Sequence, residues 1–397
     1  MDVDVPLFLP LYGQRRLHDL RRLAHAEKRL SLRIQGQMNF DSGWEWAYWL
    51  NDVVTARASW DPLVDATDDW QAFEMSLEPF CRLLGPVVGK RMREFMVALT
   101  RDQLDLLIYG RVNGTECHML DKLSGIAYLS GSDTWYDLPR MFGLKFTQPD
   151  KVHMDESHDP LFKDAQILLR EMERTFSAAQ EEAEKVLALA VEEARQCDAI
   201  QQEGGGAGRQ RECYYMSRDT GSGAVGLVEE IRDAVMMLAM RAKHVRLLYD
   251  SAEQDVIPER AASLQGQARG VLHAASAVVK RREAQYRVPW QRIASWRENP
   301  TVYRFGYVWA VHSLYYWWRD QGLCEKGSLQ SQMSPCYLNR MDASETVVGW
   351  GKKALEFMRY LINTYSPFSP GYPLEIINCI APPSKEYSFP DDLYHHY

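Results

Sequence analysis

The sequence lacks the patterns that mark several common functional classes. Its apolar runs fall short of the roughly 18 residues that a membrane-spanning helix needs, so we predict no membrane span. Basic residues form only short clusters and the net charge is -8, which argues against nucleic acid as a partner. Nucleophile elbows, phosphate loops, kinase signatures and zinc-ligand spacings are also absent. We therefore predict no catalytic residue, no cofactor and no metal site in this chain.

Cysteine is scarce, and its spacing marks no redox or metal site. The seven cysteines include no CxxC pair, which favours buried free thiols. Alternatively, Cys324 and Cys336 flank a polar loop that a disulfide could close. Residues 1–10 lack the charged and apolar regions of a signal peptide, whereas Asn113-Gly114-Thr115 is an N-glycosylation sequon. Secretory and cytoplasmic locations both stay open, and a secretion signal would lie upstream of Met1.

The chain does contain enough apolar sequence for large helical cores. With 46% hydrophobic and 25% charged residues, it has the composition of a soluble globular protein with two or three domains. From residue 60 onward, strand signals nearly vanish and apolar residues recur at helical spacing. We predict a mainly α-helical bundle with helices at residues 68–84, 87–109, 116–130, 159–202, 226–251, 259–286, 300–321 and 343–365.

The first 62 residues follow a different pattern. Apolar residues alternate at residues 3–9 and 32–38, which predicts two short strands. A helix at residues 14–30 separates them. A Trp-rich helix then runs from Asp41 or Ser42 to Trp60, and we expect it to be buried because it is apolar around most of its circumference. This strand-helix-strand-helix order is the repeating unit of parallel α/β folds.

Changes in composition divide the chain into three parts. We predict a β-α-β-α segment at residues 1–62, an α-helical domain at 63–365, and an irregular Pro/Tyr-rich tail at 366–397. Residues 203–223, rich in glycine and charge, predict a mobile linker within the helical domain. The helix before this linker has apolar positions at 3-4 spacing, which suits antiparallel packing, and we expect the helix after the linker to be its partner.

The best candidate site follows the second predicted strand. Asn39, Asp41, Trp44 and Glu45 lie at its carboxyl end, where parallel α/β folds bind ligands. Asn39 and Asp41 would hydrogen-bond sugar hydroxyls while Trp44 stacks on the ring and Glu45 holds the local geometry. The alternative needs no ligand, because the dipole of a helix stabilises carboxylates near its N-terminus. Both interpretations stay open.

Part of the chain resembles a known group of proteins. The polar strand tip, the aromatic helix ending in Trp60-Asp61-Pro62, and the later stretch Phe80-Cys81-Arg82-Leu83-Leu84-Gly85-Pro86 carry the resemblance. Together they resemble the end of the (β/α)8 barrel and the start of the helical domain in glycoside-hydrolase-like proteins, including relatives of hexosaminidases and α-glucuronidases. The resemblance covers about residues 2–107. It implies that the two strands are the last of a TIM barrel, with sugar bound at its mouth and the catalytic carboxyl pair on earlier strands outside this chain.

Two functions from different classes follow. The first is the C-terminal part of a carbohydrate-active protein, with a glycan ligand and a barrel domain missing upstream. The second is a non-catalytic α-helical scaffold or protein-interaction module. Six more strand-helix units encoded upstream of Met1 would favour the first function, and a genuine start at Met1 would favour the second.

Overall fold

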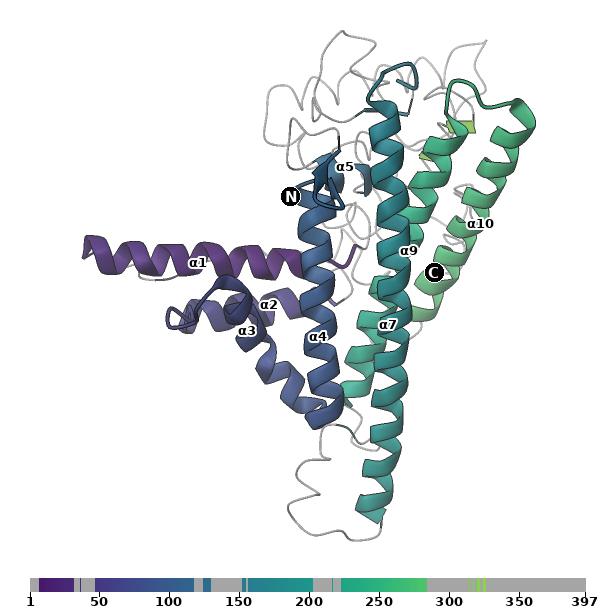
Figure 1. The fold of residues 1–397 in the computed structure, drawn as a ribbon. Coiled ribbons are helices and arrows are strands. Elements are labelled where there is room, and N and C mark those ends of the chain that lie inside the picture. Colours follow the sequence, from purple (N-terminus) through teal and green to yellow (C-terminus); the bar gives the residue numbers. More distant parts are fainter. Residues whose placement is uncertain are drawn as a thin grey trace, which may run out of the picture. The chain divides into compact units, whose positions relative to one another are not determined.

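The computed structural model confirms the mainly α-helical class predicted from the sequence (Figure 1). Among the described residues, none of the helices combines the length and the apolarity that crossing a bilayer requires. The structure describes residues 7–31, 36, 47–117, 124–129, 152–154, 156–202, 216, 223–283, 314, 317, 320, 321, 324 and 325.

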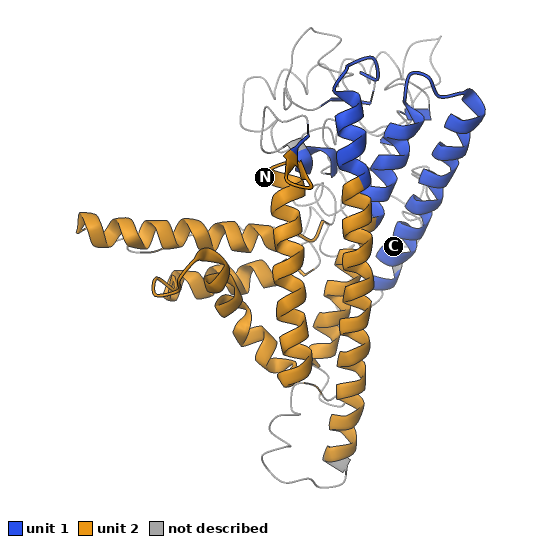
Figure 2. Ribbon diagram, in the orientation of Figure 1, with its two compact units in different colours: residues 1–5, 116–170, 240–397 blue, residues 6–115, 171–239 orange. Residues whose placement is uncertain are grey.

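The chain divides into two compact units (Figure 2). Unit 1 comprises Met1–Val5, Glu116–Arg170 and Met240–Tyr397, and unit 2 comprises Pro6–Thr115 and Glu171–Ala239. Two long helices, α7 (Phe162–Gln202) and α9 (Ala224–Ser251), each begin in one unit and end in the other. The boundary predicted at residue 62 falls inside unit 2. Most of the predicted linker and all of the predicted tail lie outside the described residues, so the predicted domain limits stay predictions.

Unit 2 begins with four helices that pack on one another (Figure 1). Helix α1 (Pro10–Leu30) contacts α2 (Trp49–Trp60), and α3 (Asp69–Leu83) contacts α4 (Gly85–Gln103). Helix α1 also contacts α3 and α4, so the four helices share one core. The side chains buried in these helices include Leu11, Leu17, Leu50, Val54, Phe73, Leu77, Val88, Met92 and Met96.

Local sequence explains how α3 begins and how closely α4 approaches it. The Asp68 carboxylate accepts hydrogen bonds from the backbone N–H groups of Trp70 and Gln71, both at 2.8 Å, and so caps α3. Further along, a Cβ atom at Gly89 would lie 2.1 Å from the carbonyl oxygen of Cys81. Only glycine allows the two helices to come this close without displacing backbone.

Two buried amides hold the start of α1, where no local side chain forms a cap. The Asn51 amide, from α2, donates to the Leu9 carbonyl at 3.1 Å and accepts from the Gly13 N–H at 3.0 Å. The Gln103 amide, from the end of α4, donates to the Phe8 carbonyl at 2.8 Å. Because the first turn of a helix leaves backbone N–H groups without partners, long-range contacts here replace a local cap. Asn51 is one of the few polar residues of the Trp-rich helix, and its burial and hydrogen bonds show that it has a structural role.

Helix α4 continues into a short π-helix and a hairpin. The π-helix η1 covers Leu104–Ile108. The strands β1 (Arg111–Val112) and β2 (Thr115–Glu116) follow and pair with each other. Their connecting turn is Asn113-Gly114, a dipeptide that favours two-residue hairpins. Because β2 contains Glu116, the helix predicted at 116–130 is wrong at its start, and its observed part is α5 (Ser124–Leu129).

Unit 1 contains α5, α10 (Pro258–Glu283), the first turns of α7 and the last turns of α9. The Gln166 amide and the Arg170 guanidinium of α7 donate to the Asp250 carboxylate of α9, at 3.1 and 3.2 Å. Since early residues of α7 contact late residues of α9, the two helices run antiparallel within this unit, as predicted. In the core, the Tyr249 hydroxyl donates to the Val152 carbonyl at 2.9 Å, and its ring stacks on Phe162.

The other helices and strands predicted from the sequence have mixed outcomes. Helices are present close to the limits predicted at 14–30, 68–84, 159–202, 226–251 and 259–286. The burial predicted for Trp60 is wrong: its side chain is 92% exposed, because α2 ends there and the chain turns away. Residues 7–9 are irregular rather than a strand. Most residues of the two predicted strands and of the helices at 300–321 and 343–365 lie outside the described part, so the TIM-barrel remnant stays a prediction.

Candidate functional site

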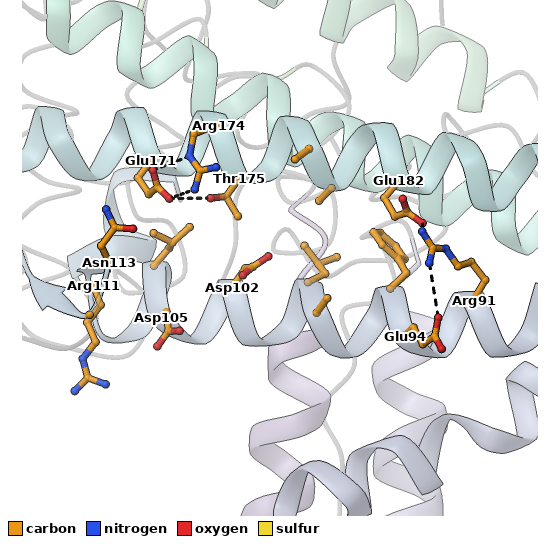
Figure 3. Close-up of a pocket in the computed structure, with 17 residues that line it drawn as sticks. Arg91, Glu94, Asp102, Asp105, Arg111, Asn113, Glu171, Arg174, Thr175 and Glu182 are labelled. Carbon is orange, nitrogen blue, oxygen red and sulfur yellow. Dashed lines mark hydrogen bonds and ion pairs between the residues drawn. The ribbon is translucent and has the colours of Figure 1, made fainter.

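A groove of about 740 Å³ lies within unit 2, between α4 with η1 on one side and α7 on the other (Figure 3). Apolar side chains, among them Phe95, Leu99 and Leu106, line part of it. Five carboxyl groups and three guanidinium groups line the rest, so the groove carries an excess of negative charge. These charged residues are Arg91, Glu94, Asp102, Asp105, Arg111, Glu171, Arg174 and Glu182.

Ion pairs occupy both ends of the groove (Figure 3). At one end, the Arg91 guanidinium lies 2.5 Å from Glu182 and 3.8 Å from Glu94. At the other end, Arg174 Nε donates to Glu171 Oε2 at 2.9 Å. This hydrogen bond lowers the pKa of Glu171, since it stabilises the ionised carboxylate more than partial burial destabilises it. Glu171 is therefore a fixed negative charge at neutral pH.

Asp102 has a different environment from the paired carboxylates. It lies near the end of α4, is half-buried, and receives no hydrogen bond from any described residue. Burial raises its pKa, the charges of Asp105 and Glu171 raise it further, and the charge of Arg174 opposes them. Figure 3 shows its carboxyl group between the two ion-paired ends. A carboxyl group held in this way gains stability from any ligand that donates a hydrogen bond or supplies a positive charge.

The composition of the groove limits its chemistry. The described residues that line it carry carboxyl, guanidinium, amide and threonine hydroxyl groups, and none of these residues is His, Cys or Ser. Among the described residues, no three His, Cys, Asp or Glu side chains are arranged to hold a metal ion. The π-helix η1 places Asp105 in the groove beside Asp102, and π-helical turns often occur at functional sites. This arrangement suits the binding of a polar, positively charged ligand.

A second polar cluster lies buried in unit 1 and serves the core. Arg241 pairs with Asp320 and donates to the Leu129 carbonyl at 3.1 Å. Arg241 also lies 3.0 Å from His244 Nδ1. Since a guanidinium only donates, His244 Nδ1 accepts, and Nε2 carries the proton toward Gln321 at 3.2 Å. Burial and the charge of Arg241 lower the pKa of His244 to about 3, so the ring is neutral at physiological pH.

This unit 1 cluster has the properties of a structural feature. Trp317 stacks on the His244 ring and covers the Arg241 guanidinium. The four polar side chains, including Gln321, are all fully or almost fully buried. Each of these four side chains has hydrogen-bond partners and almost no exposed surface, so none of them is available to a ligand.

The structure does not describe the residues of the site predicted from the sequence. Asn39, Asp41, Trp44 and Glu45 lie outside the described residues, so the sugar site at the strand tip stays a prediction. The groove residues were not predicted as a site, because Asp102 and Glu171 occur in separate helical segments with ordinary charged faces. The one local signal was the Asn113-Gly114 turn, which predicts a hairpin but does not indicate what lies beside it.

Among the described cysteines, three are free thiols and one is disulfide-bonded. Cys324 is a free thiol 3.2 Å from the Ser251 hydroxyl, which excludes the disulfide with Cys336 that loop length suggested. Burial raises the pKa of Cys324 to about 11, so the thiol is protonated. Cys197 is disulfide-bonded, with its partner outside the described residues, and is therefore not a free thiol. The free-thiol interpretation is confirmed for Cys81 and Cys117, both buried.

Comparison with known proteins does not identify a family for this chain. No protein-family model, no curated protein and no solved structure matches it.

Proposed function

We propose that unit 2 is a binding module for a small ligand that carries a protonated amino group beside hydroxyl groups. One observation carries the proposal: the half-buried Asp102 carboxyl faces a groove and receives no hydrogen bond from a described residue. An ammonium group placed beside it would supply hydrogen bonds and favour the ionised carboxylate. The excess of carboxyl over guanidinium groups in the groove likewise favours a cation over an anion.

Hydroxyl groups of the same ligand would find partners toward the ends of the groove. The carboxylates of Glu171 and Glu182 have acceptor capacity beyond their arginine partners, and arginine donors lie beside them. Amino sugars combine an ammonium group with several hydroxyls, and so they suit both the groove and the carbohydrate-associated function that the resemblance implies. That wider function, the missing upstream barrel and the glycan site at residues 39–45 stay predictions. The scaffold alternative predicts that the groove binds no small ligand.

Isothermal titration calorimetry of the full chain against three compounds tests this proposal. Glucosamine carries an amino group and hydroxyl groups, putrescine carries only amino groups, and glucose carries only hydroxyl groups. We expect the affinity for glucosamine to exceed that for glucose. Asp102→Asn should weaken glucosamine binding roughly 10-fold to 100-fold, because a hydrogen bond to a charged group is lost. Binding that is equal in wild type and Asp102→Asn, or absent for all three compounds at millimolar concentration, would contradict the proposal.

Two controls separate a local effect from a change in net charge. Asp19→Asn removes the same charge from an exposed position of α1 outside the groove, and it should leave glucosamine binding unchanged. Proton release provides a second readout. Because an ammonium group would lower the raised pKa of Asp102, binding in mildly acidic buffer should release protons, and the measured heat should depend on the buffer's ionisation enthalpy. This dependence should be reduced in Asp102→Asn.

A further inference from the structure

The hairpin after η1 presents its turn to solvent. The turn residues Asn113 and Gly114 have φ values of 51° and 80°, the positive φ at both positions that a type I′ hairpin turn requires. Asn113, Gly114 and Thr115 are all exposed. A Cβ atom at Gly114 would meet no heavy atom within 4 Å, so the space around the turn is open. An enzyme that acts on this turn would reach it without unfolding the neighbouring helices.

The Asn113 side chain is available for chemistry at this turn. It receives and donates no hydrogen bond among the described residues, and Figure 3 shows it at the Glu171 end of the groove with no drawn contact. Thr115, two residues further on, supplies the hydroxyl that the sequon requires and is also exposed. Both residues of the sequon that an N-glycosylation enzyme must recognise are therefore accessible.

The rest of the sequence makes this site unambiguous. Asn113-Gly114-Thr115 is the single sequon of the chain, because Asn299-Pro300-Thr301 has the spacing but is excluded by its proline.

We propose that Asn113 is an N-glycosylation site, modified from a polyprenyl-pyrophosphate-linked oligosaccharide. The Asn113 carboxamide nitrogen attacks C1 of the first sugar and forms the N–C1 bond. The bond between C1 and the pyrophosphate oxygen breaks, and the lipid pyrophosphate leaves with the electron pair. The nitrogen loses one proton and keeps the other. The glycan would stand at the edge of the groove, but its attachment does not depend on the binding function proposed above.

Translation of the full chain behind a cleavable secretion signal, in the presence of endoplasmic-reticulum microsomes, tests the proposal. We expect a mobility shift of one glycan that an endoglycosidase removes, and a glycopeptide that maps to residues 112–122. Thr115→Ser keeps the sequon and should keep the shift, whereas Thr115→Ala should lose it. Asn113→Asp should also lose it while preserving the turn, because Asp-Gly favours the same hairpin.

A positive control makes a negative result decisive. Asp65→Asn creates a sequon with the exposed Thr67 in the α2–α3 loop of the same unit. Introduced together with Thr115→Ala, it should restore one glycan and so report that the chain entered the microsomes. A wild-type chain that stays unmodified in membranes that modify the Asp65→Asn chain would overturn the proposal.

Discussion

Each unit contains a buried polar cluster, and the two clusters are of different kinds. In unit 1 the cluster is ionic, because Arg241 and Asp320 face each other with no exposed surface. In unit 2 it is neutral, because the Asn51 and Gln103 amides bond to backbone groups at the start of α1. Removing one partner of a buried ion pair leaves an uncompensated charge, whereas removing an amide leaves only neutral groups without partners. The two clusters should therefore respond very differently to single substitutions.

The largest effect is expected for Asp320→Ala in unit 1. The Arg241 guanidinium would remain buried without its carboxylate, which should lower the free energy of unfolding by about 3–5 kcal/mol. Urea denaturation followed by circular dichroism measures this change. The double variant Arg241→Met with Asp320→Leu removes both charges and should recover most of the loss. A midpoint for Asp320→Ala close to that of wild type would show that the pair is not buried in solution.

A smaller loss is expected for Asn51→Ala in unit 2. The Gly13 N–H and the Leu9 carbonyl would lose their partners, at about 1–3 kcal/mol for each group, and water reaching the start of α1 would reduce this cost. We expect a total loss of about 2–4 kcal/mol in the same urea experiment. Arg57→Ala, on the exposed face of α2, is the matched control and should change stability by less than about 0.5 kcal/mol. Equal losses in the two variants would refute the capping role of Asn51.

The smallest change in stability should be a gain, and it should come from replacing Asp102 in the groove. The pKa of Asp102 is raised in the folded chain, mainly by burial. Ionisation of this carboxyl group therefore destabilises the folded state relative to the unfolded state. Below the unfolded pKa, near 4, both states hold the proton and no penalty exists. The penalty appears as the pH rises through that value and is complete above the folded pKa.

Asp102→Asn should therefore slightly stabilise unit 2 at pH 7 and leave its stability unchanged at pH 3. Denaturation midpoints at the two pH values measure the difference. This result would separate Asp102 from the satisfied polar groups of both clusters and mark it as a residue that costs stability in the unliganded chain. A loss of stability at pH 7 would indicate that the Asp102 carboxylate has a structural partner.

The helices were predictable wherever local signals agreed. Apolar residues at 3-4 spacing predicted α7, and a helix predicted to begin at Asp68 is α3, which the Asp68 side chain caps. The hairpin shows how a local signal can be misread. Asn113-Gly114 was interpreted only as part of a sequon, although the same dipeptide favours a two-residue turn, and the next helix was therefore placed too early.

The sequence alone determined that this chain is mainly helical, because helix periodicity, caps and breakers act within a few residues of one another. It also determined the single sequon, since that pattern is three residues long. Only the tertiary structure decided that Asp102 and Glu171 share a groove, that Asn51 caps a helix other than its own, and that Asp320 neutralises Arg241. Each of these pairs joins residues far apart in the chain. Their contacts depend on how whole helices pack, which no local pattern specifies.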